Sequence, residues 1–278
     1  MTPRGHLLGG VAGALAVAGT AGLGVGAAHA QEQAQAQPPA LRDFCADRPG
    51  KGLPPCVLDA GHLQIETGLL DAAFQHDSGL SSSDYAIGST ELRYGLTAAM
   101  EAELSCTPLI VDRQPGQSRR TGVGDLTFGV LTALTGPDAK GPAVSLQGFV
   151  TAPTASHGLG AGGWTGGARL PASAPLASGF TLGLTPELDL VRNAAGDGIH
   201  FAWAGAAGLS RAFGPATFGV ELWGALNDDP SGRTGQASAD LTAALMLGAN
   251  AQLDAGTNIG LNRNTPDVEV YVGISRRF

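Results

Sequence analysis

The residues best suited to chemistry in this sequence are acidic side chains that recur at alternate positions. Glu101 and Glu103 are two residues apart, as are Glu187 and Asp189. Side chains two residues apart in a β-strand point to the same face of a sheet, so each pair would share one face. With the other charges of the same parity they form one candidate set: Glu66, Glu91, Arg93, Glu101, Glu103, Asp125, Arg169, Glu187, Asp189, Glu221, Asp240, Asp254 and Glu269.

This set allows two interpretations if its face encloses an interior. Carboxylates that line a water-filled passage would attract cations and repel anions. Carboxylates that pair with the arginines would instead fill a narrow interior as a polar core. The sequence contains no measure of the interior radius, so both interpretations stay open.

Hydrolytic chemistry has weaker support. A serine hydrolase needs a serine, a histidine base and a polar group that orients the histidine. His76 and His157 fall in expected loops near Ser78 and Ser156, but no motif pairs them, and the same holds for His62 and His200. We therefore predict no catalytic residues and an activity that is not enzymatic.

Metal and phosphate sites are also weakly indicated. Residues 193–197 (NAAGD) and 228–230 (DDP) carry oxygen ligands suited to calcium, but neither has the spacing of a known calcium loop. Residues 158–163 (GLGAGG) lack the strand-to-helix setting of a phosphate-binding loop. We expect ordinary turns at these places, with no metal and no cofactor.

The elements that must position the charged set are β-strands, and the last one shows this best. In residues 267–278 the apolar Val268, Val270, Val272 and Ile274 alternate with polar or small residues, and the sequence ends on Phe278. This period of two predicts a strand with one apolar face. Outer-membrane barrels of bacteria commonly end in such a strand, and their assembly machinery reads the terminal aromatic residue. We therefore interpret Phe278 as an assembly signal, with a soluble β-domain as the competing interpretation.

Similar segments fill the sequence from residue 61 onward. Their connections are alternately longer and polar or short, as in barrels whose two ends differ. After residue 30 no apolar run is long enough to cross a bilayer as a helix. We predict an all-β transmembrane antiparallel up-and-down barrel of about 12 strands over residues 61–278. The aromatic share of 5% counts against this prediction, because such barrels carry aromatic girdles.

The beginning of the sequence has the features of an exported protein. Residues 1–30 combine Arg4, an apolar Ala/Gly-rich run and the small-x-small site Ala28-His29-Ala30, which predicts a cleaved secretory signal peptide. Residues 31–60 are expected to form a periplasmic linker before the barrel. An oxidising compartment favours a disulfide between Cys45 and Cys56 in that linker, with two free thiols as the alternative. We interpret the remaining Cys106 as a small buried hydrophobic residue.

Charge and location limit the partners. The net charge of −8 argues against a nucleic-acid-binding protein. The partners expected are outer-membrane lipid, the barrel-assembly machinery and a small-molecule solute.

Four stretches resemble one known family: residues 45–51 (CADRPGK), 122–125 (GVGD), 184–189 (LTPELD) and, most specifically, 260–278 (GLNRNTPDVEVYVGISRRF). They are similar to outer-membrane transporters grouped with proteins of the phenol meta-degradation pathway. The resemblance implies a barrel in the bacterial outer membrane that passes small aromatic or otherwise hydrophobic solutes, and it implies no catalytic residues. A structural or partner-binding barrel without transport and a lipid-modifying barrel enzyme are the alternatives.

Overall fold

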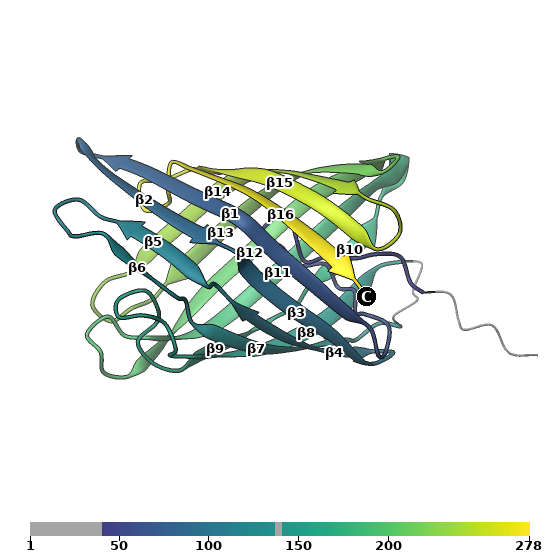
Figure 1. The fold of residues 1–278 in the computed structure, drawn as a ribbon, viewed down its shortest axis with the longest axis horizontal. Coiled ribbons are helices and arrows are strands. Elements are labelled where there is room, and N and C mark those ends of the chain that lie inside the picture. The colour runs from purple at the N-terminus through teal and green to yellow at the C-terminus, as the bar shows by residue number, and fades with distance from the viewer. Residues whose placement is uncertain (1–40, 137–140) are drawn as a thin grey trace, which may run out of the picture. The chain divides into compact units, whose positions relative to one another are not determined.

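The strands form a closed antiparallel barrel in the computed structural model, which describes residues 41–136 and 141–278 (Figure 1). The described elements are β1 Leu63–Asp77, β2 Leu80–Ile87, β3 Ser89–Thr97, β4 Met100–Cys106, β5 Leu109–Arg113, β6 Arg120–Gly122, β7 Leu126–Ala133, β8 Ala143–Ala152, β9 Thr165–Arg169, β10 Ala172–Pro175, the 3-10 turn η1 Ala177–Gly179, β11 Phe180–Arg192, β12 Ile199–Phe213, β13 Ala216–Asn227, β14 Thr234–Met246, β15 Ala251–Gly260 and β16 Val268–Arg277.

The barrel closes where β16 pairs with β1, so the sheet has no free edge along this seam. Four of the twelve barrel strands are interrupted, giving the pairs β2/β3, β4/β5, β6/β7 and β9/β10. Two of these breaks fall at Pro108 and Pro171, which cannot donate a ladder hydrogen bond. A third falls at Gly88, whose φ of +73° is unfavourable for other residues. The predicted fold class and strand number are confirmed.

Burial in this barrel is the reverse of that in a soluble domain. On β16, the side chains of Val270, Val272 and Ile274 are 36–43% exposed, whereas Ser275 and Arg277 are 0% and 6% exposed. The same alternation of apolar residues outside and polar residues inside runs through the other strands. An exposed apolar surface of this extent matches the lipid face of a membrane barrel.

Exposed aromatic side chains gather toward both ends of the barrel. We call the end that carries Leu63 and Phe278 the terminal end, and the opposite end the loop end. Toward the terminal end lie Tyr94, Phe213, Phe218 and Phe278; toward the loop end lie Phe74, Trp164, Phe201 and Trp203. The low aromatic share is therefore concentrated on the outer surface, where girdles belong. Within the described ranges, no helix is both long and apolar enough to cross a membrane.

Two local predictions need correction. The loop expected around His76 and Ser78 is mostly strand over residues 75–83, and the turn between β1 and β2 is reduced to Ser78 and Gly79 with φ of +52° and +82°. Cys106 is exposed rather than buried. Cys106 alternates with the lumenal Glu103 and Ser105, and in this barrel the apolar positions of a strand form the outer surface.

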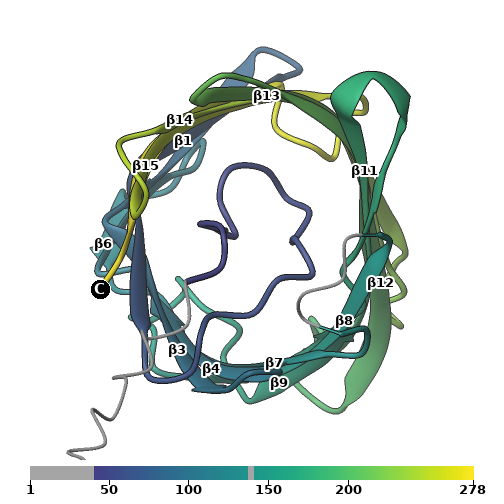
Figure 2. The ribbon, with the colours of Figure 1, turned by 90° about the vertical axis from the view of Figure 1, so that its right-hand side faces the viewer.

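The largest correction concerns the segment before the first strand. Residues 31–60 were expected to form a periplasmic linker, yet residues 41–60 lie inside the ring of strands (Figure 2). We call residues 41–60 the plug. The disulfide between Cys45 and Cys56 is present and closes its central loop. The predicted signal peptide and residues 31–40 lie outside the described residues.

The position of Phe278 allows a test of the assembly-signal hypothesis. Its backbone N–H donates to the Leu63 carbonyl at 2.7 Å, while its ring is 58% exposed and adds little to the packing of the barrel. We expect deletion of Phe278 to lower the yield of assembled barrel, whereas Phe278→Tyr should assemble normally. The measurement is the amount of barrel in outer-membrane fractions, and equal yields for the deletion and the wild type would contradict the hypothesis.

Candidate functional site: a barrel lumen occupied by the plug

Lumenal carboxylates bind the backbone of the plug. Glu66 on β1 accepts hydrogen bonds from the backbone N–H of Asp47 at 3.0 Å and of Arg48 at 3.2 Å. A backbone without regular secondary structure leaves its N–H groups without partners, and each such buried group is costly. Glu66 therefore stabilises the irregular chain that passes over it.

Two further carboxylates repeat this arrangement along the plug. Glu221 on β13 accepts from the backbone N–H of Lys51 at 2.8 Å and of Gly52 at 3.0 Å. Glu101 on β4 accepts from the backbone N–H of Leu58 at 2.6 Å. Three carboxylates on three different strands thus hold the plug at successive points. This is the physical reason why residues 41–60 lie in the lumen.

Arg93 on β3 is the charged centre of the plug site and is fully buried. Its guanidinium lies 3.0 Å from Asp47, 2.9 Å from Glu66 and 2.7 Å from Glu101. It also donates to the carbonyl oxygens of both disulfide-bonded residues, Cys45 at 3.2 Å and Cys56 at 3.1 Å. One side chain therefore holds both ends of the central loop and offsets part of the negative charge of the three acids around it.

The plug contributes two cations of its own to the wall. Arg48 pairs with Asp254 on β15 at 3.1 Å, and its guanidinium lies 5.5 Å from the centre of the Tyr271 ring. Lys51 pairs with Glu269 on β16 at 3.2 Å, and its ammonium lies 4.7 Å from the centre of the Trp223 ring. Cations at these distances are attracted to the faces of aromatic rings.

A second polar network covers the opposite wall. Arg169 on β9 pairs with Glu187 on β11 at 2.9 Å and donates to Gln147 on β8 at 3.1 Å. Gln147 in turn donates to Glu103 on β4. Asp189 is half-buried on the same face of β11 as Glu187. These residues connect four strands of the wall. Among the described residues, their hydrogen bonds and ion pairs do not involve the plug.

Asp125 has a different role from the one expected. Its carboxylate accepts the backbone N–H of Ala155 and of Ala161, each at 2.8 Å, and so fixes the loop between β8 and β9. Most of the predicted set therefore binds the plug, bridges wall strands or fixes a loop, whereas Glu91 and Asp240 lie on the lumenal wall without any of these roles among the described contacts. Asp240 is buried beside Glu221 in the strand register.

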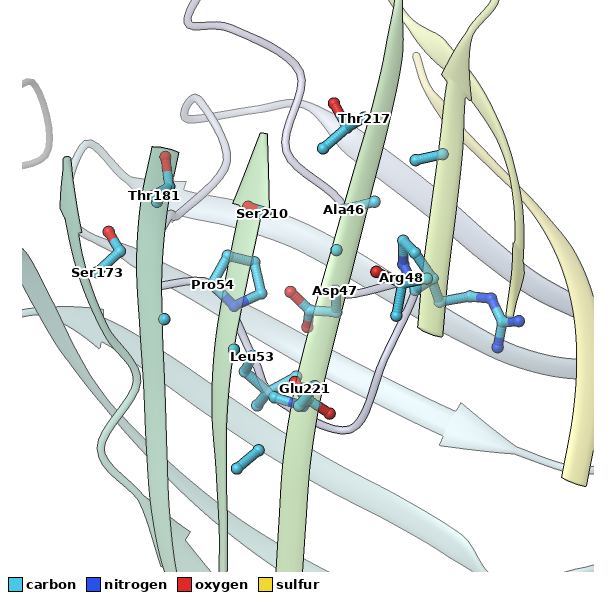
Figure 3. Close-up of a pocket in the computed structure, with 18 of the residues that line it drawn as sticks. Ala46, Asp47, Arg48, Leu53, Pro54, Ser173, Thr181, Ser210, Thr217 and Glu221 are labelled. Atoms are coloured by element: carbon cyan, nitrogen blue, oxygen red, sulfur yellow. The ribbon is translucent and has the colours of Figure 1, made fainter. Parts of the chain in front are cut away.

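The described residues line two cavities in the lumen. The first has a volume of about 300 Å³ and lies between the plug and β10–β14, with Leu53 and Pro54 alongside Thr181, Ser210 and Thr217 (Figure 3). Glycine and alanine residues form much of its wall, which leaves room between wall and plug: Ala172, Gly183, Ala206, Gly208, Gly219 and Ala244.

The second cavity has a volume of about 330 Å³ and is polar. Glu66, Glu91 and Asp125 line it together with hydroxyl groups from β3, β4 and β7. Arg48 borders both cavities. The plug thus lies against two spaces, each of which could hold a small solute.

Neutral polar side chains of the site were missed in the sequence because only charges were considered. Gln64 donates to the Cys45 carbonyl at 2.8 Å, and Gln252 donates to the Arg48 carbonyl at 2.9 Å. Ser145 donates to the Pro55 carbonyl at 2.6 Å, and Thr185 exchanges hydrogen bonds with the backbone of Leu53. All four occupy lumenal positions in their strands, so their parity was an available signal.

His76 Nδ1 lies 3.0 Å from Ser81 Oγ at an exposed turn, and no hydrogen bond in the described ranges joins the other ring nitrogen of His76 to an acidic side chain. His200 is buried, and its ring nitrogens lie 2.9 Å from Asn193 Oδ1 and 2.6 Å from Asn227 Oδ1. Close by, Asp229 accepts hydrogen bonds from Ser231 and from the Ala194 backbone, and these donors lower the pKa of Asp229 to about 2. This cluster joins two loops at the loop end. Across the described ranges, no three His, Cys, Asp or Glu side chains converge as a metal site.

The disulfide gives a prediction about the stability of the docked plug. Cys45 and Cys56 are 11 positions apart, and closing a loop of that size restricts the undocked chain by about 3 kcal/mol. We expect replacement of both cysteines by serine to accelerate trypsin cleavage after Lys51, because the plug should then undock more often. The measurement is the cleavage rate in detergent-solubilised barrel, with dithiothreitol-treated wild type as a second route to the same state. Unchanged cleavage in both samples would contradict this role.

The fold is shared with solved outer-membrane barrels. An outer membrane channel from Pseudomonas putida F1 aligns with a TM-score of 0.67 at 15% identity, covering 83% of this chain and 99% of the other. The beta domain of the Bordetella autotransporter BrkA aligns with a TM-score of 0.50 at 18% identity, covering 79% and 100%. A closed barrel with an apolar outside and a polar lumen is the architecture that spans the bacterial outer membrane, and this protein is such a barrel.

Comparison at the sequence level identifies the family. No curated protein matches the chain. A family model described as "Putative MetA-pathway of phenol degradation" matches residues 46–278, which include most of the plug and the whole barrel. The resemblance seen in the sequence is thereby confirmed, and the chain belongs to this family.

Proposed function

We propose that this protein is a channel through which small solutes cross the outer membrane, and that the plug controls their passage. The observation that carries the proposal is the way the central loop of the plug is held. Between residues 44 and 54 it is anchored by ion pairs and by hydrogen bonds to wall carboxylates. The side chains of Arg48 and Lys51 are 23% and 25% exposed, so water can replace their contacts when the middle of the loop moves.

The base of the plug is anchored differently and would stay in place. Val57 and Leu58 are buried, and Arg277 on β16 pairs with Asp59 at 3.8 Å and donates to the Arg42 carbonyl at 2.8 Å. Gly95 on β3 lies against this base, since a Cβ there would sit 2.1 Å from the Asp59 carbonyl oxygen. The central loop can therefore leave the lumen while the base remains docked.

We further propose small single-ring or similarly sized apolar solutes as the cargo. The support is the 300 Å³ cavity, whose wall combines small apolar residues and hydroxyl groups with the charged Asp47, Arg48 and Glu221, and the family description, which refers to phenol degradation. Ligand sites of this kind are mostly apolar with a few polar groups that orient the ligand. No catalytic step is part of the proposal.

Planar-bilayer recording tests this function. Wild-type protein should conduct ions, and a small aromatic solute such as benzyl alcohol should reduce the current in a concentration-dependent manner. A barrel with a purely structural role would conduct no current, which would overturn the proposal.

Two glycines offer a matched pair of variants for the cargo. A Cβ at Gly183 meets no atom within 4 Å and Gly183 lines the cavity, so Gly183→Leu should fill it and abolish the response to the aromatic solute. A Cβ at Gly148 also meets nothing within 4 Å, but Gly148 is exposed between Leu146 and Val150 on the outer face. Gly148→Leu should respond as wild type does. Equal responses from both variants would refute the assignment of the cavity.

A further inference from the structure

Buried oxygen atoms without a hydrogen-bond donor gather on one part of the lumenal wall. Among the described residues, this part of the wall carries both Asp240 carboxylate oxygens on β14 and Asn258 Oδ1 on β15, together with Ser238 Oγ, which lies beside Asp240, and the Tyr271 hydroxyl of β16, which lies beside the Gly50 backbone. Other such oxygens belong to Asp47, Gln64, Glu103 and Asp112. Ser238, Asp240 and Asn258 are 0%, 1% and 4% exposed. A buried carboxylate without a positive partner is highly unfavourable.

The strand register brings these groups together. Asp240 is the cross-strand neighbour of Asn258, and Asn258 is the cross-strand neighbour of Glu269. The Tyr271 hydroxyl lies above Gly256, where a Cβ would be 2.2 Å from it, two residues from Asn258. Directly opposed residues have Cβ atoms about 5 Å apart, so the side-chain oxygens of Asp240 and Asn258 can reach one common point. Ser238 lies two residues from Asp240 on the same face of β14.

The positive groups and amide donors in this region are engaged elsewhere. Lys51 Nζ pairs with Glu269 at 3.2 Å, and Asn258 Nδ2 donates to the same carboxylate at 2.9 Å. The carboxylate of Glu221, which neighbours Asp240, already binds two N–H groups of the plug. The cluster is thus negative, composed of oxygen atoms and enclosed by the wall.

We propose that this cluster binds one hard metal cation, such as Ca²⁺ or Na⁺, with Asp240 as the charged ligand. Hard cations prefer carboxylate, amide and hydroxyl oxygens, which are the groups present here. A bound cation would neutralise Asp240 close to Glu221 and Glu269, two carboxylates that hold plug residues. The inference does not depend on transport.

Terbium luminescence provides the test, because Tb³⁺ substitutes for Ca²⁺ and is excited through nearby aromatic rings. Trp223 is the cross-strand neighbour of Ser238, so it should sensitise a bound ion. With the full-length protein in detergent, we expect terbium emission that Ca²⁺ or Na⁺ displaces; the more effective competitor identifies the ion.

Variants decide whether the signal comes from this cluster. Asp240→Asn removes the charged ligand of the proposed site. Loss of a group that only supports a metal ligand lowers metal affinity by about 10- to 100-fold, so this variant should weaken terbium binding by at least that much. Ser238→Ala is a smaller change and should also weaken terbium binding measurably. It keeps the test decisive if Asp240→Asn fails to fold. Asp228→Asn alters an exposed loop acid paired with Arg233 and should leave the signal unchanged. Absence of emission, or emission unaffected by both cluster variants, would overturn the proposal and indicate a proton on Asp240.

Discussion

A variant that lacks residues 44–56 is expected to conduct ions severalfold better than the wild type. The deletion removes the central loop, both disulfide-bonded cysteines and the cations Arg48 and Lys51, while the wall keeps its complete hydrogen-bond ladder from β1 to β16. Water would then hydrate the carboxylates that the plug now occupies. The measurement is single-channel conductance in planar bilayers.

The same variant should also become cation-selective. Glu66, Glu221 and Asp254 would lose their plug partners, and a lumen with an excess of acids holds a negative potential. Reversal potentials in a salt gradient measure this selectivity. Deletion of residues 32–40, which precede the plug, is the control and should leave conductance and selectivity unchanged. A 44–56 deletion that conducts like the wild type would show that the plug does not limit passage.

The second large effect is expected at Arg93. Replacing Arg93 by alanine leaves Asp47, Glu66 and Glu101 close together without their shared cation, and removing one partner of a buried ion pair typically costs about 3–5 kcal/mol. The carbonyls of Cys45 and Cys56 lose their donors as well. The measurement is the free energy of unfolding in lipid from urea titrations.

Arg233 offers the matched control for this experiment. It also pairs with an aspartate, Asp228 at 2.8 Å, but its side chain is 66% exposed. Exposed pairs contribute about 0.2–1 kcal/mol, so Arg233→Ala should change the unfolding free energy little. Similar losses for the two variants would contradict the view that Arg93 is the electrostatic centre of the plugged lumen.

The barrel was predictable because its constraints are local and repeated. Every strand that crosses lipid must alternate apolar and polar side chains, so the parity of Val270, Val272 and Ile274 against Ser275 and Arg277 could be read directly from the sequence. Strand ends were less predictable. Nothing in the composition of residues 75–83 shows that β1 and β2 continue almost to Ser78 and Gly79.

The plug could not be predicted by the same reasoning. An irregular segment has no periodicity, and its place depends on partners far away in the sequence, such as Glu221 for Lys51 and Asp254 for Arg48. A count of charges suggested a choice between an open acidic passage and a self-paired polar core. The structure shows a third arrangement, in which wall carboxylates bind backbone N–H groups that no count of charged side chains includes.

The central claim, that the plug must move for solutes to pass, is tested most directly by locking it to the wall. A Cβ at Gly52 would lie 3.3 Å from the Ala206 Cβ on β12, close to the about 3.5–4.5 Å found in disulfides. It would also lie 2.7 Å from Glu221 Oε2, so this carboxylate must shift, and the single variant Gly52→Cys measures that effect alone. We predict that oxidised Gly52→Cys/Ala206→Cys conducts less than wild type and that reduction restores the conductance. Both single variants and reduced wild type, whose Cys45–Cys56 bond also opens, serve as controls. An oxidised, cross-linked protein that conducts as well as the wild type would contradict the account.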